Sequence, residues 1–142
     1  MIDTNLGAGV VATLAYAGVG LSILTFGYVV LDLITPGKLR ELVFAERNVN
    51  ASVVVCGNVL ALAAIVTTAI LESDDDLSTG LIQAASYGLL GVALQAVAFK
   101  IIDIVTPGHL GHIVTDRRPD PASAVVAVFS LALGAVLSAA IT

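Results

Sequence analysis

The sequence predicts an all-α membrane protein with four transmembrane helices, arranged as two tandem two-helix repeats. One observation is composition: 58% of the 142 residues are hydrophobic and 12% are charged, whereas soluble domains carry about 25% charged residues. A second is distribution, because four long runs have no charged residue, namely 4–31, 48–71, 77–99 and 121–142. Each run exceeds the roughly 20 residues with which a helix crosses the hydrocarbon core.

The third observation is an internal repeat with an offset of 71 positions. The segment Asp32–Gly37 reads DLITPG and the segment Asp103–Gly108 reads DIVTPG, and no gap is needed between residues 6 and 142. We therefore expect two repeat units, 1–71 and 77–142, joined by the acidic loop 72–76. Because each unit holds two spans, both units take the same orientation in the membrane.

The first span of each unit is expected at about 6–34 and 77–105, and it ends at a Thr-Pro-Gly step. Proline removes a helical donor and disfavours helix at the preceding residue. Glycine tolerates positive φ, and the threonine hydroxyls can bond to the freed carbonyls. The residues of these helix breaks are Thr35, Pro36, Gly37, Thr106, Pro107 and Gly108.

A short helix should follow each break, before the second spans at about 50–71 and 121–141. In the first unit the apolar residues of 38–47 have helical spacing, which is typical of a helix lying in the membrane interface. The counterpart in the second unit is weakened by Gly111. At the next helix start, Asp120 is expected to be the N-cap before Pro121, and in the first unit either Asn48 or Asn50 can cap.

Small residues mark expected helix contacts in the first and third spans. They recur every four residues, at Gly9, Thr13 and Ala17 and again at Gly80, Ala84 and Gly88. Helices in lipid associate through close packing of such faces. We expect these two equivalent faces to pack against each other.

Loop charge predicts the orientation. All six Lys and Arg residues lie in or beside the two Thr-Pro-Gly loops, whereas the loop 72–76 is acidic. By the positive-inside rule the Thr-Pro-Gly loops are cytoplasmic and both termini are outside. This describes a multi-pass membrane protein.

Asp32 and Asp103 are the first candidates for a polar site, because each carboxylate lies at the C-terminal end of a span, where the helix dipole disfavours it. In one interpretation each accepts hydrogen bonds from its loop and pairs with Arg47 or Arg118. In the other, the two carboxylates form a cytoplasmic vestibule that binds a cation or a proton.

Three further polar residues inside the spans occur in one unit only, namely Asn58, Gln95 and Lys100. The other unit has an apolar residue at each equivalent position, namely Phe129, Leu24 and Val29. Buried amides usually bridge helices, although Asn58 and Gln95 are also candidates for lining a polar path. Lys100 is expected to snorkel or to pair with Asp103.

We expect no enzyme activity, cofactor, metal site or nucleic-acid binding. No hydrolase triad, phosphate-binding loop or zinc-binding cysteine set is present in the sequence, and no long basic stripe. His109 and His112 have a spacing that metal ligands can use, but no third ligand is evident. The one cysteine, Cys56, is expected to be a packed apolar thiol.

The paired Asp-x-x-Thr-Pro-Gly segments, together with Glu46, Asn48 and Ala51, make the chain resemble the domain of unknown function 350 family. That resemblance covers nearly the whole chain and implies a small prokaryotic inner-membrane protein with two tandem two-span units. The second unit matches at Asp103, Thr106, Pro107, Gly108 and Ala122, but reads Arg117-Arg118-Pro119 where the first has the Glu-x-Asn element.

Two functions are therefore expected. The first is a homo-oligomeric channel or transporter-like protein for a cation or small solute, with Asp32 and Asp103 at its inner mouth. The second is a membrane scaffold or sensor that recruits a cytoplasmic protein through its basic loops. The residues of that partner-facing surface are Arg40, Glu46, Arg47, Asn48, Arg117 and Arg118.

Overall fold

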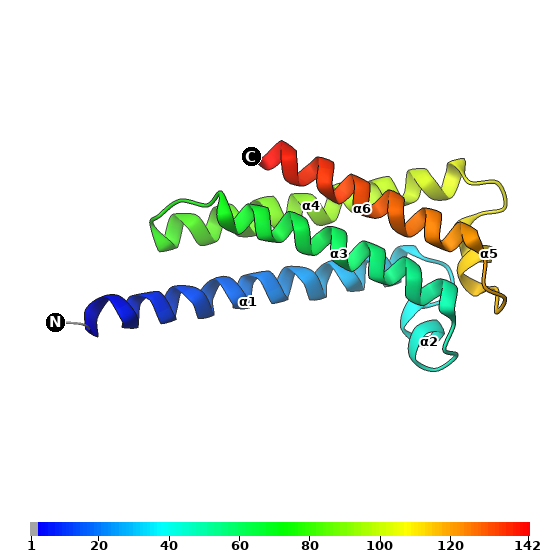
Figure 1. The fold of residues 1–142 in the computed structure, drawn as a ribbon, viewed down its shortest axis with the longest axis horizontal. Helices are drawn as coiled ribbons and strands as arrows, with labels where there is room; N and C mark the ends of the chain where they lie inside the picture. The colour runs from blue at the N-terminus through cyan, green and yellow to red at the C-terminus, as the bar shows by residue number, and fades with distance from the viewer. Residues whose placement is uncertain (1–2) are drawn as a thin grey trace.

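The computed structural model describes residues 3–142, with side-chain surroundings from Leu6 onward, and in this part of the chain it is entirely helical. Four helices have the length and hydropathy to cross a membrane, as the charge-free runs predicted. Two short helices follow the Thr-Pro-Gly turns (Figure 1). The elements are α1 (Asp3–Ile34), α2 (Leu39–Phe44), α3 (Val49–Leu71), α4 (Leu77–Val105), α5 (Leu110–Thr115) and α6 (Pro121–Ile141).

The capping residues expected from the sequence define the starts of α3 and α6. Asp120 accepts a hydrogen bond from Ala122 N at 2.9 Å with Pro121 at the first helical position. At the start of α3 the cap is Asn48, whose Oδ1 accepts from the backbone N–H groups of the first turn. The start of α4 is capped by Asp76, which sequence reasoning did not identify.

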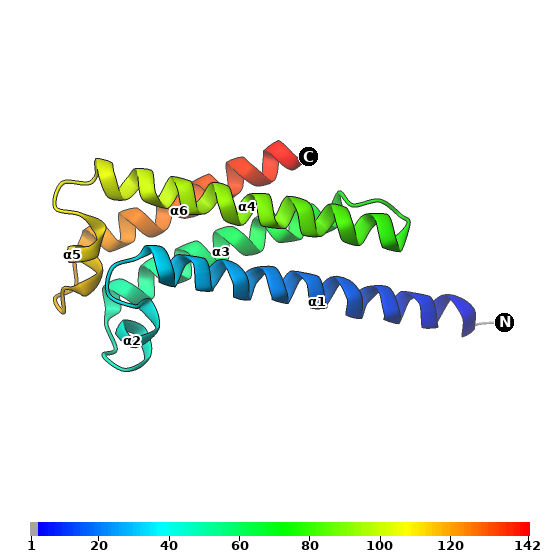
Figure 2. The ribbon, with the colours of Figure 1, turned by 180° about the vertical axis from the view of Figure 1, so that it is seen from behind.

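Both Thr-Pro-Gly turns have the expected conformation and share one end of the molecule, here called the TPG end (Figures 1 and 2). Gly37 has φ 107° and Gly108 has φ 100°, a region that L side chains rarely adopt. Thr35 Oγ1 donates to Leu31 O at 2.8 Å, and Thr106 Oγ1 donates to Ile102 O at 2.7 Å. Each of these carbonyls also accepts the backbone N–H of the same threonine, at 3.1 Å for Leu31 O and 2.9 Å for Ile102 O. The hydroxyls therefore add a second hydrogen bond to carbonyls that the helix already uses, and the expected bonds to freed carbonyls are not seen.

Over the described residues, the four long helices pack as a bundle in which one diagonal pair is in contact and the other is not. The most extensive contact joins α3 to α6, and α4 packs on α1, on α3 and on α6. Within the described residues α1 and α6 do not pack against each other and lie on opposite sides of the bundle (Figures 1 and 2). The bundle therefore has a short diagonal, from α3 to α4, and a long one, from α1 to α6.

Close approach of α3 and α6 depends on two glycines. A Cβ on Gly57 would lie 2.6 Å from Ala127 Cα, and a Cβ on Gly134 would lie 2.7 Å from Ala61 Cα. Such distances are too short for a side chain, so these positions let the two backbones meet.

The small face of α4 packs against α1 as expected, but the expectation that the equivalent small face of α1 forms the other side of this contact is wrong. On α4, Gly80, Ala84 and Gly88 are buried, and a Cβ on Gly88 would lie 2.6 Å from Ile23 Cδ1 of α1. Their counterparts on α1, the Gly9, Thr13 and Ala17 positions, are exposed. The contact of α1 with α4 therefore joins two different faces.

The short helices α2 and α5 form as expected and are packed into the apolar core at the TPG end. Leu39, Leu110 and Val114 are fully buried and belong to one apolar cluster with residues of the long helices. Gly111, expected to weaken α5, is buried where a Cβ would lie 3.0 Å from Pro36 Cγ. It lets α5 pack directly on the first Thr-Pro-Gly turn.

Candidate functional site

A pair of amides links α3 to α4 inside the bundle. Gln95 Nε2 donates to Asn58 Oδ1 at 3.1 Å and to Asn58 O at 3.3 Å, and Asn58 Nδ2 donates to Val54 O at 2.9 Å. Both residues are buried, with 4% and 1% of their surface exposed. The pair bridges two helices, as buried amides in membrane proteins commonly do, and it lies on the short diagonal of the bundle.

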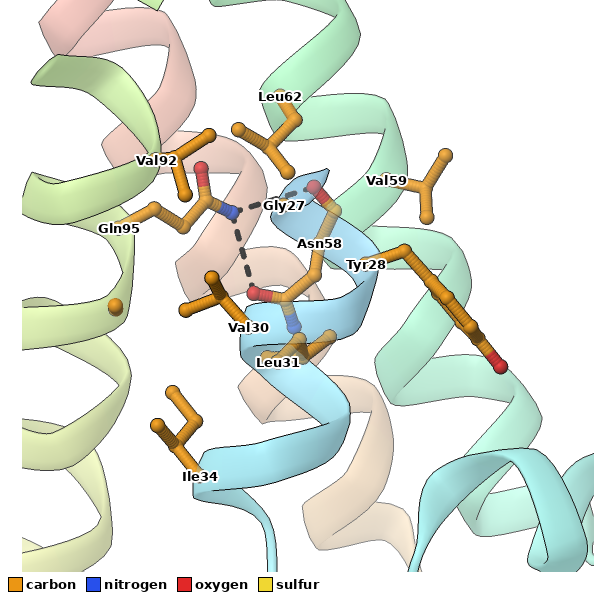
Figure 3. Close-up of a pocket in the computed structure, with 11 residues that line it drawn as sticks. Gly27, Tyr28, Val30, Leu31, Ile34, Asn58, Val59, Leu62, Val92 and Gln95 are labelled. Atoms are coloured by element: carbon orange, nitrogen blue, oxygen red, sulfur yellow. Dashed lines mark hydrogen bonds between the residues drawn. The ribbon is translucent and has the colours of Figure 1, made fainter. Parts of the chain in front are cut away.

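One polar atom of this pair has no partner. Gln95 Oε1 is buried and accepts no hydrogen bond. Figure 3 shows Gln95 reaching from α4 toward Asn58 with its nitrogen directed at that residue and its oxygen turned away. The side chains border a cavity of about 10 Å³ between α1, α3 and α4, roughly the space that one water molecule requires.

Tyr28 of α1 also lines this cavity and was not among the candidates expected from sequence. Its hydroxyl is buried without a partner and points away from the two amides (Figure 3). The repeat carried a signal for it, because position 99 of the second unit is Phe and only the first unit has the hydroxyl. Tyr28 therefore adds a second unpartnered polar atom to this region of the bundle.

Asp32 and Asp103 each cap the short helix that follows. Asp32 Oδ1 accepts from Arg40 N at 3.0 Å, and Asp103 Oδ1 accepts from Leu110 N at 2.9 Å. Each carboxylate thus satisfies a free N–H group at a helix start, where negative charge is favourable. This is the hydrogen bonding to the loop that the first interpretation expected, and neither residue is among those lining the Gln95 cavity.

The ion pairs at the TPG end differ partly from expectation. Lys100 Nζ lies 3.8 Å from Asp103 Oδ2, as the spacing suggested. Arg117 reaches Glu46 at 3.9 Å, where the Arg117 side chain is 85% exposed and the Glu46 side chain 43%. The expected pairs of Asp32 or Asp103 with Arg47 or Arg118 are not among the ion pairs of the described residues. Exposed pairs of this kind contribute little stability.

Two asparagines at the start of α3 form hydrogen bonds to the loop 116–120 of the second unit. Asn48 Nδ2 donates to Asp116 O at 2.9 Å. Asn50 Nδ2 donates to Asp116 O at 3.1 Å and to Arg118 O at 2.7 Å, while its Oδ1 accepts from Asp120 N at 2.9 Å. Every hydrogen-bonding group of the Asn50 amide is used, so the loop 116–120 is held against the start of α3.

This arrangement corrects one part of the predicted partner-facing surface. Asn48 is 4% exposed and its side chain binds within the chain, so it is not available to a partner. The other predicted residues are exposed, namely Arg40, Glu46, Arg47, Arg117 and Arg118. Asn50 has the larger structural role here, and sequence reasoning considered it only as a helix cap.

His109 and His112 are exposed at the start of α5. Among the described residues, no three His, Cys, Asp or Glu side chains are grouped closely enough to hold a metal ion. His109 has φ 59° and lies directly after Gly108, as Lys38 with φ 51° lies after Gly37. The two positions share a positive φ, although ψ is 89° at Lys38 and 133° at His109, and their side chains differ in chemistry.

Four apolar helices of spanning length, closed around a buried amide pair, define a small multi-span integral membrane protein. The chain belongs to the family described as Domain of Unknown Function (DUF350), which matches residues 5–141. A UPF0719 transmembrane protein of Mycolicibacterium paratuberculosis is 42% identical over 134 residues, covering 94% of this chain and 89% of the relative.

Proteins of Mycobacterium bovis and Mycobacterium tuberculosis, also named UPF0719 transmembrane proteins, are 42% identical over 134 residues and are covered to 88% of their length. No solved structure matches the chain. This membership agrees with the resemblance seen in the doubled Asp-x-x-Thr-Pro-Gly segment. The names of the relatives describe them as transmembrane proteins, which agrees with the four helices of spanning length.

Proposed function

We propose that this protein is an oligomeric channel or transporter-like protein for a cation or another small solute. It would reside in the bacterial plasma membrane as two tandem repeats with both termini outside. The observation that carries the proposal is the unpartnered Gln95 Oε1 in the core of the bundle. Both Gln95 and Asn58 lie near the middle of spanning helices, at the boundary between the two units.

A buried acceptor without a donor is costly, and more so within a bilayer, where water is scarce. Polar groups kept at that depth commonly mark solute or proton pathways. The cavity beside Gln95 has room for about one water-sized group, which under this proposal would correspond to a closed state of the pathway. A monovalent cation or a small hydrogen-bond donor would bind at Gln95 Oε1, and Asp32 and Asp103 would contribute negative charge at the inner mouth.

Flux into proteoliposomes tests this proposal. We expect uptake of a monovalent cation, followed with rubidium or with a proton-sensitive dye, to fall at least tenfold in Gln95→Leu, which introduces the residue found at position 24 of the first unit. Thr68→Val is the matched control, because the Thr68 hydroxyl bonds only within its own helix, to Ala64 O at 3.0 Å. If wild-type vesicles show no flux under any gradient, the transport proposal fails.

The proposed orientation has its own test. A reporter that is active only outside the membrane, fused after Thr142, should be active, and the same reporter inserted at the exposed Arg47 should be inactive. The basic loops at the TPG end and the acidic loop 72–76 at the other end support this orientation. A cytoplasmic C-terminus would overturn it.

The second candidate is a scaffold that recruits a cytoplasmic protein, and one observation favours it. The Asn48 and Asn50 hydrogen bonds hold the loop 116–120 against the start of α3. The side chains exposed at this end are Arg40, Arg47, Arg117 and Arg118. A photo-crosslinker at Arg40 or Arg117 should then capture one soluble protein, and Arg47→Glu with Arg118→Glu should abolish capture. A crosslinker at Asp75 of the acidic loop is the control.

A further inference from the structure

We infer that copies of this chain join head to tail, each new contact repeating the internal contact between the first and second units. The new interface would place α1 of one copy on the groove between α4 and α6 of the next copy. The inference rests on the oligomeric part of the proposed function and is independent of whether the protein conducts.

The first observation concerns two equivalent spaces of very different size. The cavity beside Gln95 lies between α1 and α3 and measures about 10 Å³. A groove of about 520 Å³ lies between α4 and α6. Its lining repeats that of the cavity with the offset of 71, since Val30, Ile34 and Leu62 correspond to Ile101, Val105 and Leu133. The second unit therefore has the same inter-helix space, but open.

The two spaces differ because a helix covers the first one and no helix of the described residues covers the second. Val92 and Gln95 of α4 close the first space. Their counterparts by position are Leu21 and Leu24 of α1, and within the described residues α1 does not pack against α6. The α1 helix of the same copy thus leaves the α4–α6 groove uncovered, and an α1 helix from another copy has the matching sequence to cover it.

Exposure of equivalent residues shows the same asymmetry on the groove side. Ile65 is fully buried by α4, whereas its counterpart Val136 is 64% exposed. Ile23 is 5% exposed and its counterpart Leu94 is 41% exposed. The residues that α4 covers in the first unit are therefore the ones left open in the second.

The covering side shows the asymmetry too. Val92 of α4 is 4% exposed, while its counterpart Leu21 of α1 is 68% exposed. Ala84 is buried and its counterpart Thr13 is exposed. The free face of α1, defined here as Thr13, Ala17 and Leu21, is thus equivalent to the buried face of α4. Leu24 lies at the edge of this face and is half-buried against the apolar cluster that contains Ile23 and Leu62. In lipid such a face gains close packing when it meets another helix.

The polarity of the paired positions agrees with this interface. Inside the chain an amide meets an amide, because Gln95 bonds to Asn58. At the equivalent contact between copies, Leu24 would meet Phe129, which is 56% exposed. Both members change from polar to apolar together, so neither contact leaves an amide facing a hydrocarbon side chain.

The symmetry of the assembly follows from the use of two different faces. An interface of this kind is heterologous and builds a ring or an open chain, in contrast to a twofold dimer, in which one face meets itself. The counterparts of Gly57 and Ala127, which touch inside the chain, are Val128 and Cys56. Val128 of one copy would therefore lie beside Cys56 of the next, slightly farther apart because Val replaces Gly.

Disulfide crosslinking in native membranes tests the inference, since both positions are exposed. A Cβ on Gly57 would lie 2.7 Å from Ala127 Cβ, so the equivalent pair of cysteines is within the 3.5–4.5 Å Cβ separation of a disulfide after a small adjustment. With an oxidant, Val128→Cys in the presence of Cys56 should give a ladder of multimers on a non-reducing gel. The matched control is Val97→Cys, which is 57% exposed on α4 at similar depth and should add no ladder.

Mixing separates head-to-tail from twofold assembly. Differently tagged copies carrying only Cys56, or only the cysteine of Val128→Cys with Cys56→Ser, should give mixed dimers and almost no dimers of one kind. Dimers of one kind, or crosslinking no stronger than with Val97→Cys, would overturn the inference. Single-molecule photobleaching in bilayers reports the copy number: oligomers without the crosslink refute this interface alone, and monomers refute the oligomeric part of the proposed function as well.

Discussion

Gln95 Nε2 lies 3.1 Å from Asn58 Oδ1 and joins α4 to α3 across the short diagonal of the bundle. The counterparts of these residues, Leu24 and Phe129, lie on α1 and α6, the two long helices that do not pack against each other. The two units therefore differ at these positions both in polarity and in packing: the amides meet across the short diagonal, and their apolar counterparts lie on the long one.

The amide pair should show measurable coupling. In a double-mutant cycle with Gln95→Leu and Asn58→Leu, we expect a coupling of about 0.5–1.5 kcal/mol, the range found for interhelical hydrogen bonds in membranes. Unfolding in bicelles, followed by steric trapping, measures the free energies. The cycle of Gln95→Leu with Thr68→Val should give a coupling near zero, and equal values for both cycles would contradict the assigned hydrogen bond.

Asn50 should determine the order of the loop 116–120. Asn50→Leu removes three hydrogen bonds to that loop, each contributing about 0.5–1.5 kcal/mol, so we expect a loss of about 2–4 kcal/mol. Hydrogen exchange at the Asp120 amide should accelerate strongly. Ser52→Ala is the control, because the Ser52 hydroxyl bonds within its own helix, to Asn48 O, and unchanged exchange in Asn50→Leu would refute the role of Asn50.

The two capping aspartates allow structure and transport to be separated. In Asp32→Asn and Asp103→Asn the amide oxygen still accepts from Arg40 N or Leu110 N, so stability should fall by less than about 1 kcal/mol. Alanine at either position removes the cap and should cost about 1–2 kcal/mol. If the carboxylates also serve the inner mouth, the Asn variants keep their stability and lose flux, whereas full flux in the double Asn variant leaves only the capping role.

The two turn glycines form a matched pair for measuring strain. Gly37→Ala and Gly108→Ala both force a side chain into positive φ, at a cost of about 1–3 kcal/mol. At Gly37 a Cβ would also lie 3.0 Å from Thr115 Cγ2, whereas at Gly108 it would meet nothing within 4 Å. We expect Gly37→Ala to be the more destabilising in an unfolding assay, and the reverse order would show that α5 does not pack on the first turn.

Acid should loosen the start of α4. Hydrogen bonds from the Ser78 hydroxyl and from the Thr79 backbone and hydroxyl groups lower the pKa of Asp76 below its ordinary value. A carboxyl whose folded pKa is depressed stabilises the fold above its unfolded pKa, about 3.9, and this contribution is lost as the pH falls through the folded pKa. The protection factor of the Thr79 amide, which removes the pH dependence of intrinsic exchange, should fall over that acidic range in wild type and stay constant in Asp76→Asn.

Much of the fold was predictable because it depends on one-dimensional features. Charge-free runs located the four long helices, and the observed α1, α3, α4 and α6 end within a residue or two of the expected positions. The Thr-Pro-Gly turns and the Asp120 cap were equally predictable, because each is a local backbone event controlled by two or three neighbouring residues.

The polar residues were only partly predictable from their positions. The sequence singled out Asn58, Gln95, Asp32 and Asp103, since polar groups within apolar runs are conspicuous. It did not show that Asn58 and Gln95 face each other, or that each aspartate turns back to cap a short helix. It also placed Asn48 on an exposed surface, whereas that side chain bonds to Asp116 of the other unit.

By itself the sequence determined that this chain has four helices long and apolar enough to cross a membrane, and that its Asp-x-x-Thr-Pro-Gly segment recurs after 71 positions. Only the tertiary structure decided that the two halves pack through different faces, so that Ile65 is buried while Val136 is open. The reason is geometric: α4 of the second unit packs onto the groove of the first, whereas within the described residues no helix packs onto the equivalent groove between α4 and α6. A sequence repeat predicts that two units are alike, but the burial of each unit depends on the helices that pack against it.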